Sequence, residues 1–492
     1  MITIKKLDNF TSLLDAIKVF DTTEFVWEFL KEINEKKDEL FVVFKKEWKT
    51  TIFSVISDND IPLPDLSQIF YSANLYQNEI YDYYGRTTKD FDNHILRLHT
   101  HPKDFFPLRK LGKPMIKSKK EFIFTTVNWE WLVEVPVWPI HAWIIPPGHF
   151  RFTVDWEDTL NLDTQMWWKH KWVEQYFSKE KDLDKLLEAS QDIAWDSAIA
   201  YALWFTRLIE EASNIKLNKS STLTRILALE LERIYNHIWT IWALWNDVWQ
   251  SFLLNWYLSI REELLELNKE IFWSRTLKWV ITYKWTNKNL KKEDLEKILK
   301  ILKQVEKRVD TLSYIEEYSS WVYDRFKDTW IVNYDTTTTH SWLWVVAKAS
   351  KLISDYRIYD KDYVENNIIV EPILWIQWDS FDRFQVRAKE IFQSIEIIKK
   401  IIKSLNEMWQ EKEIKTEDLK LNDWIYTSFV EWHRWEIFQM IIIENWNITY
   451  YKAKDPSFVN WTLLEYAVLK NIIADFPICN KSFDLSYSWF DM

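Results

Sequence analysis

The stretch Leu227-Ala-Leu-Glu-Leu-Glu-Arg-Ile-Tyr-Asn-His-Ile-Trp-Thr-Ile241 decides the fold of the larger part of this 492-residue chain. Its apolar side chains recur every three or four residues, as on one face of an α-helix; they are Leu227, Leu231, Ile234, Ile238 and Ile241. The polar residues Glu230, Arg233 and His237 share another face. The pattern therefore predicts an amphipathic helix that carries a stripe of charge.

Two further helices are predicted from the same spacing. The apolar positions are Leu295, Leu299, Leu302, Val305, Val309 and Leu312 in residues 288–318, and Phe384, Ile391, Ile395, Ile398 and Ile402 in the later helix. The later helix also has a polar stripe, formed by Arg383, Arg387, Glu390 and Ser394. From about residue 165 the chain is thus expected to be mainly helical, and the aromatic residues 474–492 are expected to form an irregular, packed tail.

The first 115 residues show a mixed α/β pattern. The expected elements are helices at residues 11–20 and 23–37 and strands at residues 40–44 and 51–56. The lysine-rich residues 110–120 mark a domain boundary, after which short β-like segments follow at 122–127, 132–137 and 150–154. The predicted fold class is α+β: a small α/β domain at 1–115, then a mainly helical domain with a small β region at 120–492.

The frequencies of Trp and Gly are the reverse of those in an ordinary protein, because the chain has 33 Trp and only 3 Gly. An ordinary chain contains about 7% Gly, and turns and helix ends need that residue. We interpret most of these tryptophans as misread glycines, UGA being a glycine codon in the source organism. Trp168 and Trp461 are expected to be genuine. The alternative is a truly Trp-rich protein, which the cost of large rings at positive φ disfavours.

Composition also excludes several classes of protein. A net charge of -11 and a pI near 5.5 argue against nucleic acid as the main partner. A single cysteine, Cys479, excludes a disulfide framework and any Cys-x-x-Cys metal clamp. No apolar run reaches the length of a membrane span, and the N-terminus lacks the apolar core of a signal peptide. We expect a soluble chain that docks on membrane proteins.

An ordered series of motifs appears once Trp is read as Gly. Residues 78–85 and 107–110 match R-E-x-x-D-x-[FY]-G-like and P-L-R-K signatures, apart from Asn78. The later motifs are G-P-I-H-A-G at 138–143, P-G-H-F-R-F at 147–152, G-x-x-H-[RK]-G-x-E at 167–174, E-L-x-R-I-x-x-H at 230–237, V-E-G-x-R-G-E at 430–436, and the segments 455–461 and 475–477. Each motif alone is weak, but their order along the chain is specific.

In this series the chain resembles a fused C/D-type subunit of complex I and the large subunit of membrane-bound, energy-converting nickel–iron hydrogenases. The resemblance implies a complex I C-subunit-like domain followed by a D-subunit-like domain. It also implies partners: a small iron–sulfur subunit that carries a cluster, and antiporter-like membrane subunits. The expected location is peripheral, on the cytoplasmic face of the cell membrane. No cofactor is expected on this chain itself, although a quinone is possible.

The departures from the family pattern are as informative as the match. A hydrogenase holds its metals with two Cys-x-x-Cys pairs, since soft thiolates suit nickel and iron. Here residues 193–196 and the region of Cys479 stand in their places, so no metal site is expected. Ile145 and Ala189 stand where complex I D subunits present His and Tyr to quinone. Asp247 remains where those subunits have the acid that partners the His.

Candidate site residues follow from the motifs. His141, Asp247, Glu431, Arg434 and Glu436 are the expected catalytic or proton-path residues; for the last three a surface network is the alternative. His170, Lys171 and Arg151 are expected to face the partner's cluster, because Lys171 stands where the D subunit has an Arg beside it. A structural polar network is expected from Glu230, Arg233, His237, Asp355 and Arg357.

The sequence thus predicts the large electron-transfer subunit of a complex-I-like or hydrogenase-like oxidoreductase. It has lost the metal site and couples redox chemistry to ion translocation in partner subunits. Two alternatives stay open: a non-catalytic scaffold of such a complex, and an NADH-quinone oxidoreductase with an atypical quinone site. An active hydrogenase would need cysteines that this chain lacks.

Overall fold

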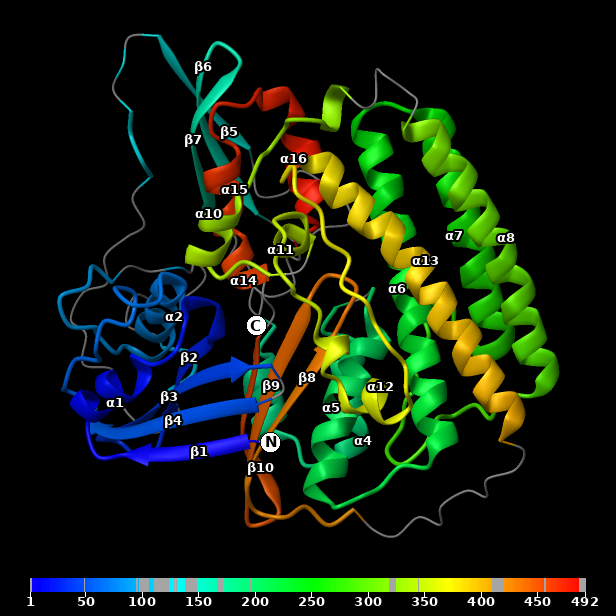
Figure 1. Cartoon of the computed structure of the whole chain (residues 1–492). Helices are drawn as coiled ribbons and strands as arrows, with labels where there is room; N and C mark the ends of the chain where they lie inside the picture. Colours follow the sequence, from blue (N-terminus) through cyan, green and yellow to red (C-terminus); the bar gives the residue numbers. More distant parts are fainter. Residues whose placement is uncertain are drawn as a thin grey trace.

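The computed structural model combines helices and sheets, as the sequence predicts for an α+β chain (Figure 1). It describes residues 2–47, 49–93, 96, 106–109, 124–127, 129, 131–137, 148–165, 171–194, 196–317, 324–343, 345–408, 419–454 and 457–485. The predicted boundary at 110–120 lies outside these residues, so the division into two domains stays a prediction.

The N-terminal part is a four-stranded sheet with helices against it. Strand order is β1 (Ile2–Leu7), β4 (Lys49–Asp58), β3 (Lys37–Lys46), β2 (Phe25–Glu32), and β1 runs parallel to β4. The helices of this part are α1 (Phe10–Ile17), which Asn9 caps, and α2 (Ala73–Tyr84). The predicted strands at 40–44 and 51–56 and the helix at 11–20 are confirmed within a few residues.

The helix predicted at residues 23–37 is wrong, because most of this segment is strand β2. Its aromatic residues lie two apart and share one face, with the rings of Trp27 and Phe29 5.4 Å apart. Phe29 stacks on Phe41 of β3 at 5.3 Å. A period of two with cross-strand aromatic pairs is the signature of a strand, and here it decides the structure.

The larger part is a layer of long helices beside a second sheet. Helix α6 (Lys219–Asp247) packs against α7 (Ser251–Phe272), α13 (Ser380–Glu407) and α16 (Phe476–Phe483), and α8 (Lys292–Glu317) packs against α7 and α13. The three helices predicted from apolar spacing are thereby confirmed. The irregular tail is not: residues 476–483 form α16, while 486–492 lie outside the described residues.

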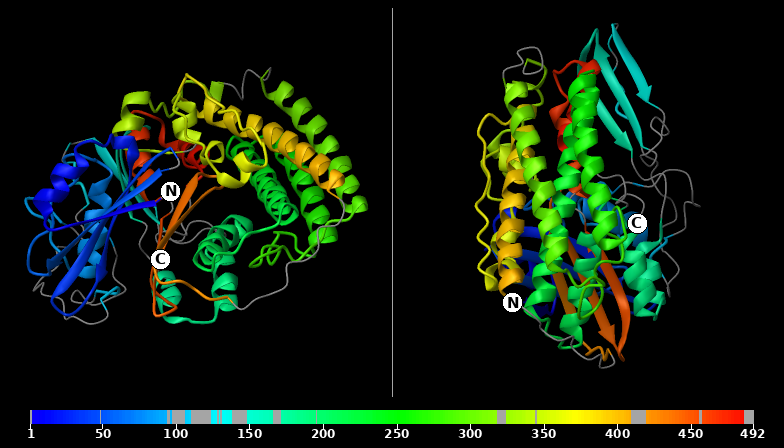
Figure 2. Two further views of the ribbon diagram at one scale, coloured as in Figure 1. Left: turned by 60° about the horizontal axis from the view of Figure 1, so that its bottom comes forward. Right: turned by 90° about the vertical axis from the view of Figure 1, so that its right-hand side faces the viewer.

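A three-stranded antiparallel sheet joins the two parts. It consists of β8 (Ile425–Glu431), β9 (Glu436–Glu444) and β10 (Asn447–Lys454), and it lies between the N-terminal sheet and the helices (Figure 2). On one side the Tyr450 hydroxyl donates to the Leu30 carbonyl at 2.8 Å. On the other side Trp204 of α5 (Ala198–Ala212) donates to the Ser428 carbonyl at 3.1 Å. The sheet is thus buried between two layers.

A third sheet projects from the top of the molecule in Figure 1. It is built from β5 (Leu132–Val137), β6 (His149–Asp155) and β7 (Asp158–Gln165), which confirms the predicted strands at 132–137 and 150–154. Residues 122–123 of the predicted strand at 122–127 lie outside the described residues, and 124–127 form no strand. The remaining helices are short: α3 (Val173–Lys179), α4 (Leu183–Gln191), α10 (Tyr334–Thr339), α11 (Val345–Ala349), α12 (Lys361–Glu365), α14 (Ser457–Asn460) and α15 (Thr462–Ala467). Within the described ranges, every helix is too short or too polar to cross a bilayer.

Many tryptophans occupy backbone conformations that favour glycine. Those with φ between 55° and 68° are Trp156, Trp172, Trp249, Trp273, Trp279, Trp330, Trp378 and Trp446. Asn445 and Trp446, with φ of 52° and 61°, connect β9 to β10, where Asn-Gly is the preferred pair. Trp273 ends α7, and its N–H bonds the Lys269 carbonyl, which is the usual C-terminal glycine position.

At exposed positions, side-chain packing does not offset the cost of a positive φ angle at tryptophan. The side chains of Trp156, Trp446 and Trp273 are 91%, 77% and 73% exposed. A large exposed ring with a left-handed backbone has neither the conformational freedom of glycine nor the burial that usually holds a tryptophan. These positions therefore support the interpretation that Trp stands where the natural protein has Gly.

We expect the substitution Trp446→Gly to raise the free energy of unfolding by about 1 kcal/mol, because it relieves a left-handed L-residue. Trp461→Gly is the control: Trp461 has φ -62° and is 3% exposed, so its loss should destabilise by about 3–5 kcal/mol. Urea denaturation of both variants measures the difference. A destabilised Trp446→Gly protein would refute the glycine interpretation at this turn.

Candidate functional site

A buried ion cluster surrounds the turn between β8 and β9. The Arg434 guanidinium donates from Nη2 to Asp196 Oδ2 at 2.6 Å and from Nε to Asp484 Oδ2 at 3.2 Å. Lys481 Nζ donates to Asp484 Oδ1 at 2.6 Å, and the Thr240 hydroxyl of α6 donates to Oδ2 at 2.7 Å. We call these five residues the Arg434 cluster. Charge-assisted bonds hold four separate segments in one place: the Asp196 segment, α6, the β8–β9 turn and the end of α16.

The charges of the Arg434 cluster compensate one another. Burial by itself would raise the pKa of Asp484, but Arg434, Lys481 and Arg387 outweigh it and hold that pKa well below its ordinary value. Asp484 therefore stays ionised at neutral pH. Arg434 is 7% and Asp196 3% exposed, so the ion pairs are screened little by solvent.

The cluster joins the two segments at which the resemblance to hydrogenases would place cysteine pairs. Asp196 ends the segment 193–196, and Asp484 lies five residues after Cys479. Both segments meet at Arg434. Burial raises the pKa of the Cys479 thiol well above its ordinary value, which disfavours the thiolate that metals need. Within the part of the chain that the structure describes, no three His, Cys, Asp or Glu side chains converge to hold a metal ion.

A second buried network lies between α6, α11 and α13, centred on the Lys348 ammonium. Lys348 Nζ lies 2.6 Å from Glu390 Oε1, 3.0 Å from Asp355 Oδ2 and 3.7 Å from Glu431 Oε1. Arg357 binds Asp355 at 2.7 Å and Glu230 at 3.2 Å. The members of this Lys348 network are Lys348, Glu390, Asp355, Glu431, Arg357, Glu230, Arg233 and His237.

The network separates its members into ionised and neutral groups. Burial would raise the pKa of Glu390, but Lys348 and the hydrogen bond with His237 hold it well below its ordinary value. Burial lowers the pKa of His237 to about 4, although Glu390 opposes this. Burial raises the pKa of Glu431 to about 8. At neutral pH His237 is therefore neutral and Glu431 holds a proton for much of the time.

The Arg434 cluster and the Lys348 network are connected through the β8–β9 turn. Arg233 donates to the Glu431 carbonyl at 2.6 Å and to the Trp432 carbonyl at 2.7 Å. Asn236 Nδ2 donates to the Asp196 carbonyl at 2.6 Å and lies 3.2 Å from His433 Nδ1. The His433 and His237 ring centroids are 6.3 Å apart. One helical turn of α6 thus contacts both clusters.

The structure brings together most of the predicted polar residues. Glu230, Arg233, His237, Asp355 and Arg357 lie in the Lys348 network, as a structural polar network requires. Of the residues expected to form a catalytic or proton path, Glu431 joins the Lys348 network and Arg434 the other cluster. What each of them does remains a prediction.

The other predicted site residues lie elsewhere. Glu436 pairs with Lys45 of β3. Asp247, at the end of α6, is partly exposed, and burial raises its pKa to about 6. Lys171 Nζ donates to the Ile193 carbonyl at 3.2 Å, beside the Asp196 segment. Arg151 pairs with Glu134 and lies over the Phe124 ring, on and near the projecting sheet. His141 and His170 lie outside the described residues.

Sequence reasoning missed three of the residues that hold these clusters: Asp196, Asp484 and Lys348. Lys348 stands in the apolar run Val345-Val-Ala-Lys-Ala349, and a lone lysine in such a run is a signal of a buried, paired cation. Asp196 and Asp484 carry no comparable signal, because their proximity to Arg434 arises only when distant segments meet.

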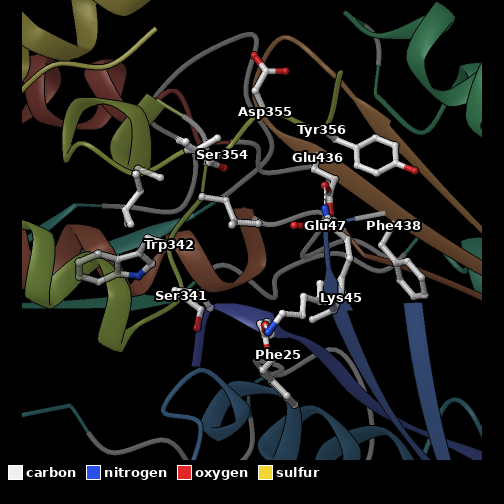
Figure 3. Close-up of a pocket in the computed structure, with 18 of the residues that line it drawn as sticks. Phe25, Lys45, Glu47, Ser341, Trp342, Ser354, Asp355, Tyr356, Glu436 and Phe438 are labelled. Atoms are coloured by element: carbon white, nitrogen blue, oxygen red, sulfur yellow. Dashed lines mark hydrogen bonds and ion pairs between the residues drawn. The ribbon is translucent and has the colours of Figure 1, made fainter. Parts of the chain in front are cut away.

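A cavity of about 400 Å³ lies between the N-terminal sheet and the helical part (Figure 3). Its walls include the end of β3, the segment before and after Asp355, and β9; Lys45, Asp355, Tyr356 and Glu436 line it. The Lys45 ammonium lies 4.7 Å from the centroid of the Tyr356 ring. The cavity therefore reaches one edge of the Lys348 network, at Asp355.

Comparison with known proteins finds similarity to subunits of NADH dehydrogenases and of hydrogenases. The family described as the 49 kDa subunit of respiratory-chain NADH dehydrogenase matches residues 247–422. Hydrogenase-4 component G of Escherichia coli is 21% identical over 79% of this chain and 68% of its own length. The membrane-bound hydrogenase subunit alpha of Pyrococcus furiosus is 19% identical over 72% and 86%. The C/D subunit of the NADH-quinone oxidoreductase of Bacteroides thetaiotaomicron is 21% identical over 78% and 77%.

These matches support the coarse prediction made from the motifs. The chain is similar, over most of its length, to subunits of complex I and of membrane-bound hydrogenases. Such similarity supports a complex-I-like oxidoreductase subunit. The C/D-type relative also matches across 421 residues, but a fusion of two ancestral subunits remains a prediction.

We expect Lys348→Met to lower the free energy of unfolding by about 3–5 kcal/mol, because it leaves buried carboxylates without their cation. The matched control is Lys361→Met, since Lys361 is a 78% exposed lysine whose nearest acid, Glu365, lies 3.8 Å away. Little change is expected there. Guanidinium denaturation followed by circular dichroism compares the two; equal effects would contradict the central role of Lys348.

Proposed function

We propose that this chain is the large electron-transfer subunit of a complex-I-like or hydrogenase-like oxidoreductase that works without a nickel–iron site. The observation that carries this is the Arg434 cluster. Asp196 and Asp484 come from the two segments that would carry the metal-binding cysteines, and both bind the Arg434 guanidinium. The guanidinium of Arg434 thus lies between the two segments that a nickel–iron site would join.

The residues present do not fit nickel and iron. The described part of the chain offers one thiol, that of Cys479, which is fully buried and held protonated. The other nearby ligands are hard carboxylates, which suit magnesium or calcium rather than these metals. A guanidinium already neutralises them, and it would repel a metal cation. No step of the function is therefore assigned to a metal of this chain.

The proposed partners are a small iron–sulfur subunit and antiporter-like membrane subunits, with the complex on the cytoplasmic face of the membrane. Electrons would reach the chain's surface from the partner's cluster. Lys171 supports this arrangement because it is exposed and is anchored to the Ile193 carbonyl, beside the Arg434 cluster. A cation at this place would stabilise the reduced cluster by Coulomb attraction.

The two connected clusters support coupling of redox chemistry to ion movement. They are buried, so a change of charge at one is screened little before it reaches the other. The linkage runs through α6, where Arg233 donates to the Trp432 carbonyl in the β8–β9 turn and Asn236 donates to the Asp196 carbonyl. A quinone acceptor would need an atypical site, because Ala189 of α4 offers no phenol and Ile145 no imidazole.

A non-catalytic scaffold is the second candidate function. The observation that favours it is the closure of the Arg434 cluster, in which Asp196 and Asp484 are both already bound by cations. A cluster of this kind stabilises the contact of four segments whether or not electrons pass nearby. The two candidates differ in whether Lys171 affects the midpoint potential of the partner's cluster.

We also infer that UGA encodes glycine in the gene for this chain. Support comes from the tryptophans at positive φ, especially the Asn445-Trp446 turn and the end of α7 at Trp273. In peptides of the natural protein that span these positions, the residue at each position should have the mass of glycine. A tryptophan mass at residue 446 would end this interpretation.

We expect the purified natural chain to contain no stoichiometric nickel or iron, because four thiolates cannot be assembled from one cysteine. The nickel and iron content per chain is measured by elemental mass spectrometry. A content of about one nickel per chain would show that the natural protein binds a metal, and it would contradict the proposal that the Arg434 guanidinium takes the place of the metal.

We expect the chain to co-purify with an iron–sulfur subunit and membrane subunits after mild detergent extraction. In that complex Lys171→Gln should shift the midpoint potential of the partner's cluster to a more negative value, by an interaction on the order of 1 kcal/mol. Redox titration followed by electron paramagnetic resonance measures it.

The control for this prediction is Lys185→Gln, an exposed lysine on α4 whose nearest acid, Glu180, is 3.9 Å away. It should leave the potential unchanged. A complex that assembles but shows no shift with Lys171→Gln favours the scaffold, and recovery of the chain only as a free monomer contradicts both candidates.

A further inference from the structure

The Lys348 network contains more buried acids than buried bases. Its cations are Lys348, Arg233 and Arg357, and its carboxyl groups are Glu230, Asp355, Glu390 and Glu431. His237 contributes no charge at neutral pH, because burial lowers its pKa to about 4. Buried charge without a counter-charge is costly. The network is therefore neutral when one of its carboxyl groups holds a proton.

Geometry selects which carboxyl group that is. Glu230 accepts from Arg357, Arg233, Ser394 and Tyr363, with Ser394 at 2.5 Å. Asp355 accepts from Arg357 at 2.7 Å and from Lys348 at 3.0 Å. Glu390 accepts from Lys348 at 2.6 Å and faces His237 at 2.7 Å. Each of these three is held by short charge-assisted bonds that favour the anion.

Glu431 has much weaker compensation. Its Oε2 accepts from the Tyr356 N–H at 3.0 Å, while Oε1 lies 3.7 Å from Lys348 and has no hydrogen-bond partner among the described residues. The charged groups that face it are Lys348 on α11, Arg233 on α6 and Asp355 before Tyr356. Asp355 is a like charge, and Lys348 lies closer to two other acids. Glu431 is thus the member best suited to hold the proton.

The cavity of Figure 3 is connected to this carboxyl group through Tyr356. Tyr356, whose N–H binds Glu431, lines the cavity together with Asp355 and Glu436. Glu436 is the register partner of Glu431 across the β8–β9 pair. Glu431 itself is 2% exposed. The backbone of Tyr356 therefore lies between the cavity and the buried carboxyl group.

We propose that Glu431 is an exchangeable proton site of this subunit and that the cavity beside Tyr356 is its route to solvent. The step is a simple ionisation, in which the O–H bond of the Glu431 carboxyl breaks and its proton passes to water in the cavity. The carboxylate that remains is stabilised by Lys348 and the Tyr356 N–H. The site gives the proposed redox coupling a proton carrier, and only that role rests on the proposed function.

Infrared difference spectroscopy of the full chain across a pH titration tests the proton itself. The carbonyl band of a protonated, buried carboxyl should disappear with a midpoint near pH 8 and should be absent from Glu431→Gln, an isosteric variant. Glu444→Gln is the control, because Glu444 pairs with Lys31 at the exposed end of β9. Glu28, Glu232 and Glu465 are other buried acids with raised pKa values, so the assignment uses the difference between variants.

Stability gives a second reading of the same proton. Burial raises the pKa of Glu431 from 4.5 to about 8, so the folded protein keeps a proton that the unfolded chain releases. Its contribution to stability is complete below about pH 4.5 and is lost as the pH rises through about 8. Glu431→Gln should flatten this part of the curve of unfolding free energy against pH. An unchanged slope, or a carboxyl band that survives in Glu431→Gln, overturns the assignment.

The route is tested by narrowing the cavity with Ser354→Phe. The shift of the Glu431 carboxyl band on transfer to heavy water should become several-fold slower than in the unchanged chain. Ser259→Phe, at an exposed position of α7, is the matched control and should leave the rate unchanged. An unchanged rate in Ser354→Phe overturns the route. Failure of the chain to co-purify with redox partners would instead overturn the proposed function and leave the band in place.

Discussion

The burial of a charged face of helix α6 is the constraint on which the rest of the structure depends. Glu230, Arg233 and His237 are at most 1% exposed, and a buried charge is stable only with partners that match it. The partners come from distant segments: Lys348 and Arg357 from the segments before α13, Glu390 from α13 itself, and the carbonyls of the β8–β9 turn. The need to pair the buried charges of α6 therefore fixes the positions of α11, α13 and the central sheet.

The same helix connects this network to the Arg434 cluster. Asn236 and Thr240, one turn further along α6, bind the Asp196 segment and Asp484. Two carboxylates and a guanidinium join these segments and fix their mutual position.

A third buried ion cluster joins the N-terminal part to the central sheet. Lys452 of β10 lies 2.7 Å from Glu79 of α2 and 2.6 Å from Glu174 of α3. Burial would lower the pKa of Lys452, but these two carboxylates raise it, so the lysine stays charged. Removal of one partner would leave a buried charge. The two parts are thus held by charge as well as by the contact of Trp27 with Phe438.

The sequence by itself determined the elements whose pattern is local. The apolar spacing of α6, α8 and α13 predicts those helices because each presents a continuous apolar face, and the excess of Trp over Gly already indicates that many tryptophans stand at glycine positions. Only the tertiary structure decided that residues 25–32 are a strand, since the choice depends on pairing with β3. It also decided which acids meet Arg434 and which carboxyl group around Lys348 lacks a close partner. Those facts depend on distances between segments that are far apart in the sequence, 238 residues for Asp196 and Arg434 and 50 for Asp484 and Arg434, and no local pattern encodes them.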